Sequence, residues 1–195
     1  MVGPAGVMRH SFKKSLKKSH EVEDLPIWEE IYKKAFPNIA VMVNHRQDGF
    51  HQRAGVDRSV ILNNSKQILI DEKARFRNEI TGKVYTDIAL EYFSDTDRKT
   101  PGWVCKPLQA DYICYAICPL GKAYLLPVIE LQKAWGKNGN DWIQKFPKIE
   151  SFNEENGNYW TTTSVGVPPE ILFPKIGNEL RICFEPYEPI EDLPF

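Results

Sequence analysis

Two carboxylates and a lysine lie at positions of the sequence where they could act together on a metal ion. Asp57 and Asp71 flank a segment that contains two aliphatic runs, and Lys73 follows Asp71 after one intervening residue. Paired carboxylates are ligands that hard divalent cations prefer. A neighbouring ammonium can orient an attacking water or help to deprotonate it. These three side chains therefore point to metal-assisted hydrolysis.

The segment that carries them predicts a β-hairpin. Residues 56–62 and 68–70 are mainly β-branched or aliphatic, and residues 63–65, Asn-Asn-Ser, tolerate the positive φ of a turn. If the turn loop has an odd number of residues, Asp57 lies directly across from Asp71. Side chains alternate along a strand. One face of the second strand then carries Leu69, Asp71 and Lys73, and the other carries Ile68, Ile70 and Glu72.

The second strand is apolar on both faces until its charged end, which is typical of a buried strand. A buried carboxylate and ammonium cost several kcal/mol unless something compensates for the lost hydration. A divalent metal ion would compensate for the acidic groups. The strand composition therefore agrees with a metal site at its end.

The pattern Gly55-x-Asp57 followed by Ile70-Asp71-x-Lys73 resembles the signature of the PD-(D/E)XK nuclease superfamily, which includes many restriction enzymes, Holliday-junction resolvases and phage exonucleases. Val56 stands where the proline of the signature would be. Further along, Gly102-Trp103 and Leu125-Leu126-Pro127 are similar to segments of small nucleases from phages and mobile elements. The resemblance implies an α/β fold with a restriction-endonuclease-like core, in which helices flank a central mixed β-sheet.

The resemblance also implies an activity and roles for residues. Asp57 and Asp71 would ligate Mg²⁺, or Mn²⁺ as a substitute, the backbone carbonyl of Glu72 would add a ligand, and Lys73 would assist the hydrolytic water. The expected function is a metal-dependent deoxyribonuclease, either an endonuclease or an exonuclease. The alternative is a catalytically inactive nuclease-like module that binds DNA or a protein partner of a phage or mobile element.

A helix is predicted to begin after Pro26, because apolar residues recur at helical spacing from Ile27 to Ala35. Many members of the superfamily place an acidic residue on this helix, facing the metal. Glu30 is the favoured candidate, and Glu29 and Glu21 are alternatives. In contrast, Asp87 and Glu91 are expected to be structural or exposed to solvent, since no spacing rule links them to the hairpin.

The remaining elements follow from apolar runs and turn residues. Residues 44–54 are expected to form a polar loop that contains His45, Arg46, His51 and Arg53. The predicted strands are residues 39–43, 85–93, 110–118, 123–126, 159–167 and 181–184. A helix is expected from Pro127 to Gly136, followed by an extended surface loop over residues 137–157, and a brief helix is expected from residue 168.

Basic and aromatic residues near the proposed site are candidates for contacts with nucleic acid. This group is Arg53, Arg58, Arg75, Arg77 and Trp103. Trp103 could instead close the edge of the core. The first 20 residues, which include Arg9, Lys13, Lys14, Lys17 and Lys18, are expected to be a flexible basic arm that could bind phosphates, and residues 21–195 are expected to form a single domain.

The composition sets the class of protein. The chain has 195 residues, 42% of them hydrophobic, and a net charge of −1, so attraction to DNA must come from local charge. Neither a run of about 20 apolar residues nor an apolar signal segment is present, which predicts a cytoplasmic protein without a membrane partner. The four cysteines are expected to be reduced, and no Cys-x-x-Cys or paired His accompanies them to form a zinc site. DNA is the expected partner, and a homodimer is the assembly that paired cuts in both strands would favour.

Overall fold

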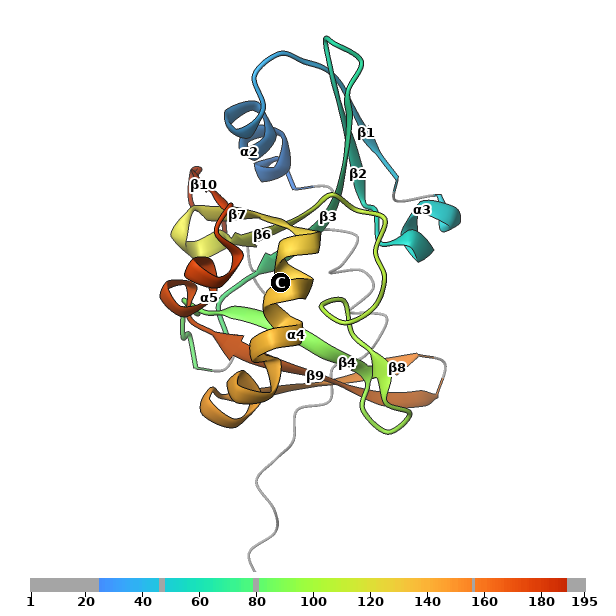
Figure 1. The fold of residues 1–195 in the computed structure, drawn as a ribbon, viewed down its shortest axis with the longest axis vertical. Helices are drawn as coiled ribbons and strands as arrows, with labels where there is room; N and C mark the ends of the chain where they lie inside the picture. Colours follow the sequence, from blue (N-terminus) through green and yellow to red (C-terminus); the bar gives the residue numbers. More distant parts are fainter. Residues whose placement is uncertain (1–24, 46–47, 79–80, 156, 189–195) are drawn as a thin grey trace, which may run out of the picture.

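A computed structural model describes residues 25–188, except residues 46, 47, 79, 80 and 156. The predicted basic arm and Glu21 lie outside the described residues. Figure 1 shows two β-sheets and the helices that lie around them. No helix of the described part is both long and apolar enough to cross a membrane.

The larger sheet has six strands in the order β1-β2-β3-β6-β7-β10. It is mixed, because β3 pairs in parallel with β6 while the other neighbours in the sheet are antiparallel. Its strands are β1 (Ile39–Asn44), β2 (Arg58–Leu62), β3 (Gln67–Arg75), β6 (Tyr112–Ile117), β7 (Lys122–Pro127) and β10 (Leu180–Cys183).

The smaller sheet has four antiparallel strands in the order β5-β4-β9-β8. Its strands are β4 (Ile88–Asp95), β5 (Thr100–Pro101), β8 (Lys148–Glu155) and β9 (Asn158–Val167). The chain therefore leaves the larger sheet after β3, contributes β4 and β5 to the smaller sheet, and returns to pair β6 beside β3. This excursion carries part of the candidate site.

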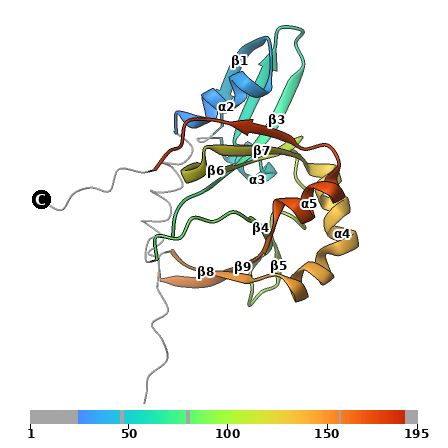
Figure 2. The same ribbon diagram turned by 90° about the vertical axis from the view of Figure 1, so that its left-hand side faces the viewer.

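In the described part of the chain, four α-helices pack around the sheets. They are α2 (Ile27–Ala35), α3 (Gly49–Ala54), α4 (Val128–Lys145) and α5 (Pro169–Ile176). Figure 2 shows α4 and α5 beside the two sheets and α2 beyond the larger sheet. Both faces of the inner strands of the larger sheet are therefore covered, whereas the edge strand β1 keeps exposed side chains.

Two apolar cores result. One core joins α2 to one face of the larger sheet and includes Trp28, Tyr32, Ile68 and Ile70. The other core fills the space among the larger sheet, the smaller sheet, α4 and α5, and Leu69 packs against it. Ile68 and Ile70 thus face α2, whereas Leu69 faces the opposite way, as the predicted alternation requires.

Most predicted elements are confirmed, including the first helix, the hairpin and the strands after it. The loop expected over residues 137–157 was wrong, because α4 continues to Lys145 and β8 follows it. Gly136 does not end the helix, since the buried face continues through Trp142. A side chain at Gly139 would meet the ring of Trp135 at 2.9 Å, so this glycine makes room for a tryptophan. The loop expected over residues 44–54 contains α3.

Burial of α2 yields a prediction about stability. Trp28 is fully buried, so Trp28→Ala should lower the free energy of unfolding by about 3–5 kcal/mol. Ile129→Ala is a matched control, because Ile129 is 68% exposed and its loss should change stability by less than about 0.5 kcal/mol. Urea unfolding followed by circular dichroism measures both. A loss below about 1 kcal/mol for Trp28→Ala would contradict the role of α2 in the core.

Candidate functional site

Asp57 immediately precedes β2, and Asp71 lies within β3. The paired register of the two strands ends with Arg58 opposite Ile70. The Asp57 backbone N–H donates to the Ile70 carbonyl at 2.9 Å, so the regular pairing is not continued from Arg58 to Asp57. The Asp57 carboxylate accepts the Glu72 backbone N–H at 2.7 Å. The carboxyl groups of Asp57 and Asp71 lie close enough to interact, because Asp57 contributes to raising the pKa of Asp71.

Asp71 is buried in an environment that disfavours its charge. It is 3% exposed, and burial raises the pKa of its carboxyl. Lys73 opposes this shift, while the neighbouring Asp57 carboxylate adds to it because two negative charges repel. Asp71 is therefore poised to accept either a proton or another cation.

Lys73 joins these carboxylates as a persistent cation. Its ammonium pairs with the Asp71 carboxylate and donates to the Glu72 carbonyl at 3.3 Å. Burial alone would lower the pKa of Lys73, but the charges of Asp71, Asp57 and Glu91 outweigh burial and raise it. Lys73 therefore holds its proton and is suited to orient a water or to balance negative charge.

Glu91 approaches the same place from the smaller sheet. Burial raises the pKa of the Glu91 carboxyl, and the opposing influences are the charge of Lys73 and a hydrogen bond from the Trp103 backbone N–H. A side chain at Gly102 would meet the Glu91 carbonyl at 2.3 Å, so a residue without Cβ is needed for Trp103 to come this close. Glu91 had been expected to be structural or exposed. Its position on β4, in the smaller sheet, instead lets its charge act on Lys73.

The site therefore gathers more negative than positive charge. Asp71 pairs with Lys73, and the charges of Asp57 and Glu91 also act on Lys73 and help to raise its pKa. Within the described part of the chain, these three carboxylates do not form a set whose oxygen atoms all lie within 4.8 Å of one another. Asp57 and Asp71 could grip one ion together, whereas Glu91 is placed as a partner of Lys73.

The other face of β3 carries a buried clamp. Glu72 Oε1 accepts hydrogen bonds from Tyr32 at 2.8 Å and from Arg58 Nε at 2.6 Å. Burial raises the pKa of Glu72 to about 7, although Arg58 and Tyr32 favour its charged form. Arg58 follows Asp57 in the chain, and Glu72 follows Asp71. The contact of Arg58 with Glu72 therefore links the segments that carry the two aspartates, on the opposite face of β3.

The first helix cannot supply the acidic residue that was expected from it. Alternation puts Asp71 and Lys73 on the face of the larger sheet away from α2, so acidic side chains of α2 lie on the wrong side. Glu30 accepts from Lys34 at 2.7 Å and from the Glu185 backbone at 3.3 Å, and Glu29 accepts from Lys33 at 2.6 Å. The expectation for Glu30 is corrected, because α2 sends Tyr32 to Glu72 instead.

Several residues that were predicted to contact nucleic acid have contacts within the protein instead. Arg58 is held by Glu72, and Arg75 pairs with Asp87 at 3.0 Å and lies over the ring of Tyr85. Trp103 is 7% exposed and packs in the core, so it is not placed to stack on a base. Arg58, Arg75 and Trp103 therefore support the fold.

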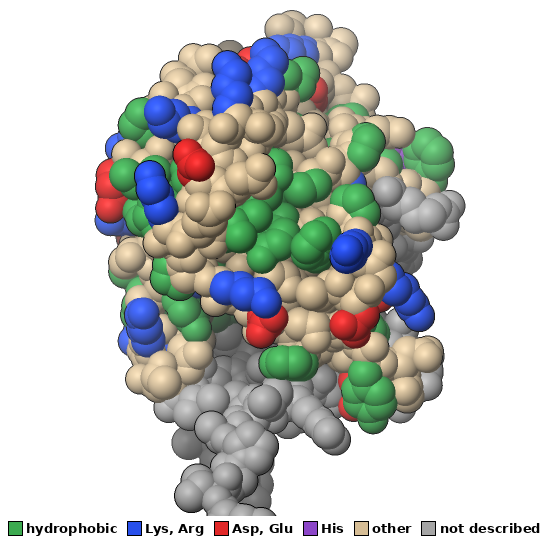
Figure 3. All heavy atoms as spheres, turned by 60° about the horizontal axis from the view of Figure 1, so that its bottom comes forward, with side chains coloured by type: hydrophobic (Ala, Val, Ile, Leu, Met, Phe, Trp, Pro, Cys, Tyr) green, Lys and Arg blue, Asp and Glu red, His purple; other side chains and the backbone are tan. Residues whose placement is uncertain are grey.

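The other two arginines of that group differ from these three. Arg77 is exposed and pairs with Glu188. The side chain of Arg53 lies outside the described residues. Figure 3 shows a face where basic and acidic side chains surround an apolar patch, which is not the uniform positive surface that would attract a duplex. Of the five predicted contacts, Arg77 is the one with a described side chain on the surface.

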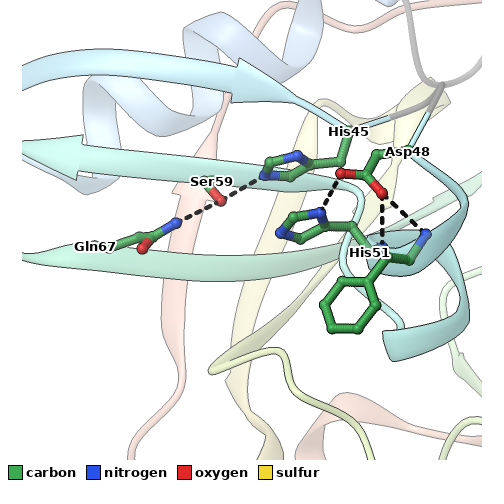
Figure 4. A network of polar contacts seen from close by, with 6 residues as sticks. His45, Asp48, His51, Ser59 and Gln67 are labelled. Atoms are coloured by element: carbon green, nitrogen blue, oxygen red, sulfur yellow. Dashed lines mark hydrogen bonds and ion pairs between the residues drawn. The ribbon is translucent and has the colours of Figure 1, made fainter.

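A second polar cluster, which sequence reasoning missed, lies beside Asp57. His45, Asp48 and His51 bring potential ligand atoms within 4.8 Å of one another. Figure 4 shows the two imidazole rings side by side with Asp48 at their edge. The spacing of three residues between successive members was the available signal, but residues 44–54 had been considered only as a polar loop.

Protonation of Asp71 gives a testable pH dependence. A folded-state pKa above the unfolded value means that the folded protein binds the proton more tightly, so stability is lost as pH rises from about 4 towards 7. Asp71→Asn removes this loss. We expect its free energy of unfolding, relative to wild type, to rise by roughly 1–2 kcal/mol between about pH 5 and about pH 8.

Urea titrations at the two pH values measure this difference. Glu130→Gln is the control, because that carboxylate lies near the surface and pairs with Lys133 at 3.0 Å. A relative stability of Asp71→Asn that is unchanged, or that falls with pH, would contradict the raised pKa.

Comparison of the chain with known protein families, curated proteins and solved structures gave no match. The functional argument therefore rests on the geometry of these residues. That geometry is an interacting pair of aspartates, an ammonium between carboxylates, and a clamp on the reverse face of the strand.

Proposed function

We propose that the protein is a metal-dependent nuclease that hydrolyses phosphodiester bonds of DNA. The observation that carries the proposal is the interaction of Asp57 with Asp71 at the end of the β2–β3 pairing, with the Lys73 ammonium paired with Asp71. The order of helix, three antiparallel strands and then a strand parallel to β3 supports a restriction-endonuclease-like core. The proposal therefore rests both on the sequence motif and on where the side chains of the motif lie.

The residues suit a hard divalent cation such as Mg²⁺ or Mn²⁺. Carboxylate and carbonyl oxygens are the donors that such ions prefer. Asp57 and Asp71 provide carboxylates, and the Glu72 carbonyl lies near them, as its contact with Lys73 at 3.3 Å indicates. The repulsion that raises the pKa of Asp71 would be relieved by a positive ion. When bound, the ion would acidify water and offset negative charge on the phosphate.

The protein's own groups then have distinct tasks. Asp57 and Asp71 would hold the ion and so would position the scissile phosphate. The Lys73 ammonium orients the attacking water and stabilises the additional negative charge on the pentavalent phosphorus. The charge of Glu91 favours the ammonium form of Lys73, and the Trp103 backbone N–H donates to Glu91 in turn. Glu91 is a positioning residue in this scheme.

Substitution of the motif residues tests the proposal. Asp57→Asn, Asp71→Asn and Lys73→Met should each lower DNA cleavage by about a thousandfold, since several kcal/mol of charge stabilisation are lost. A labelled panel of linear duplex, single strand, nicked circle, four-way junction and RNA is incubated with Mg²⁺, Mn²⁺ or EDTA. Lys133→Ala is the matched control, because Lys133 is largely exposed and should leave cleavage unchanged.

The outcomes of this assay separate the two functional classes. Cleavage that requires metal and is lost in all three variants would establish the nuclease and identify its substrate. Full activity in any one variant would refute the assigned site. Binding of DNA by the folded wild type without cleavage of any substrate would favour the catalytically inactive nuclease-like module.

Glu91 provides a separate prediction. Glu91→Gln keeps the shape of the side chain and an acceptor for the Trp103 N–H, but it removes the charge that faces Lys73. We expect kcat to fall about 10- to 100-fold, as for other residues that orient a catalytic group, while KM for DNA stays the same. Glu130→Gln is the control for loss of a carboxylate. An unchanged kcat, or a loss confined to KM, would remove Glu91 from the mechanism.

A further inference from the structure

The histidine cluster beside Asp57 comes from one short stretch of the chain, between the end of β1 and the first turns of α3. His45 follows the end of β1, Asp48 precedes α3, and His51 lies within α3. The two rings are parallel within 8°, with centroids 3.9 Å apart. His51 Nδ1 lies 2.7 Å from Asp48 Oδ2. A carboxylate and two imidazoles thus converge at one edge of the larger sheet (Figure 4).

His45 is also oriented from outside the cluster. Its Nε2 lies 2.7 Å from Ser59 Oγ, which accepts a hydrogen bond from Gln67 Nε2 at 3.1 Å. Ser59 is 1% exposed, so this partner is fixed within the sheet. Metal-binding histidines characteristically use one ring nitrogen for such a partner, which leaves the other nitrogen directed at the ion. For His45, the remaining nitrogen is Nδ1.

We propose that His45, Asp48 and His51 form a binding site for a late first-row transition-metal ion, of which Zn²⁺ is the representative. Two imidazole nitrogens and one carboxylate oxygen suit Zn²⁺, Co²⁺ or Ni²⁺ rather than Mg²⁺, which prefers oxygen ligands. This site is distinct from the carboxylates Asp57 and Asp71. It does not depend on the proposed nuclease activity.

Binding requires a local change that the side chains can make. A metal lies in the plane of each imidazole that binds it, so the stacked His51 ring must turn and release Asp48. Donor atoms around zinc are about 3.3 Å apart, so the present set, within 4.8 Å, must contract. Both movements involve side chains at least partly accessible to solvent, while Ser59 keeps His45 in place. Three protein ligands leave a position for water or another ligand.

The site is joined to the strand that carries Asp57. The His45 backbone N–H donates to the Asp57 backbone carbonyl at 2.8 Å, and the His51 backbone carbonyl accepts the Val56 backbone N–H at 3.0 Å. An ion that links His45 to His51 would therefore brace the segment immediately before β2. Zinc should raise the melting temperature of the protein as well as bind to it.

The test is a zinc titration of the full chain against a chromophoric chelator. Wild type should take up one Zn²⁺ per chain, and Co²⁺ in its place should give the visible absorption of a nitrogen- and oxygen-bound ion. His51→Ala should weaken the affinity by about 100-fold or more, and Ser59→Ala by about 10- to 100-fold. Asp48→Asn removes the anionic ligand but keeps an acceptor for the Phe50 backbone N–H at the start of α3. A weaker zinc affinity of this variant would therefore report the loss of the ligand and not the loss of the helix cap.

Controls separate this site from other zinc-binding groups. Asp71→Asn and the double variant His10→Ala/His20→Ala should bind zinc as wild type does. Cys105→Ser/Cys183→Ser tests the two exposed cysteines and should also leave binding unchanged. Circular dichroism in EDTA shows whether each variant is folded. Absence of zinc uptake by wild type would overturn the proposal. So would a zinc affinity equal to that of wild type in the folded Asp48→Asn and His51→Ala variants.

Discussion

The register of β2 against β3 is the constraint on which the candidate site depends. Arg58 pairs with Ile70, and this alignment brings Asp57 near Asp71 on one face of β3 and Arg58 to Glu72 on the other. A shift by one residue would invert the faces of β3 and send Asp71 towards α2. Apolar burial on both sides prevents this, because Ile70 belongs to the core under α2 while Leu69 packs against the opposite core.

The same strand separates two electrostatic environments. On the α2 side, Glu72 is matched by Arg58 and Tyr32, and the apolar surroundings favour this closed arrangement. On the other side, Lys73 faces more carboxylates than it can neutralise. A buried excess of negative charge is costly to folding, and such arrangements are found where a protein binds cations or performs chemistry. The balanced face supports the strand, and the unbalanced face is available for function.

Local patterns in the sequence were sufficient for the hairpin and for the direction of its side chains. Alternation of Ile68, Leu69 and Ile70 predicted that Asp71 and Lys73 share one face of β3. The expected opposition of Asp57 and Asp71 was conditional on an odd turn loop, and the structure ends the regular pairing at Arg58, the residue next to Asp57. Glu91 could not be identified in this way, because its approach to Lys73 depends on the path of β4 through a second sheet. The buried positions of Arg58 and Trp103 also depend on tertiary packing, which charge and aromatic content do not reveal.

Helix ends were harder to predict than helix positions for a related reason. Gly136 resembled a terminator, yet α4 continues because Trp142 adds to its buried face and Gly139 accommodates Trp135. The acidic residue expected on α2 failed for a geometric reason, since that helix covers the face opposite Asp71. In both cases a local preference gave way to packing between segments that are distant in sequence.

The pairing of β4 with β9 has a consequence for the order in which the protein matures. Ile88 pairs with Val167, so β4 is synthesised well before the strand that it pairs with, β9. Such long-range pairing makes folding slow, because a large loop must close before the contacts are gained. The hairpin with Asp57 and Asp71 can form early, but Glu91 reaches Lys73 only when the smaller sheet is complete. A nascent chain therefore carries the acidic pair well before it acquires the assembled centre.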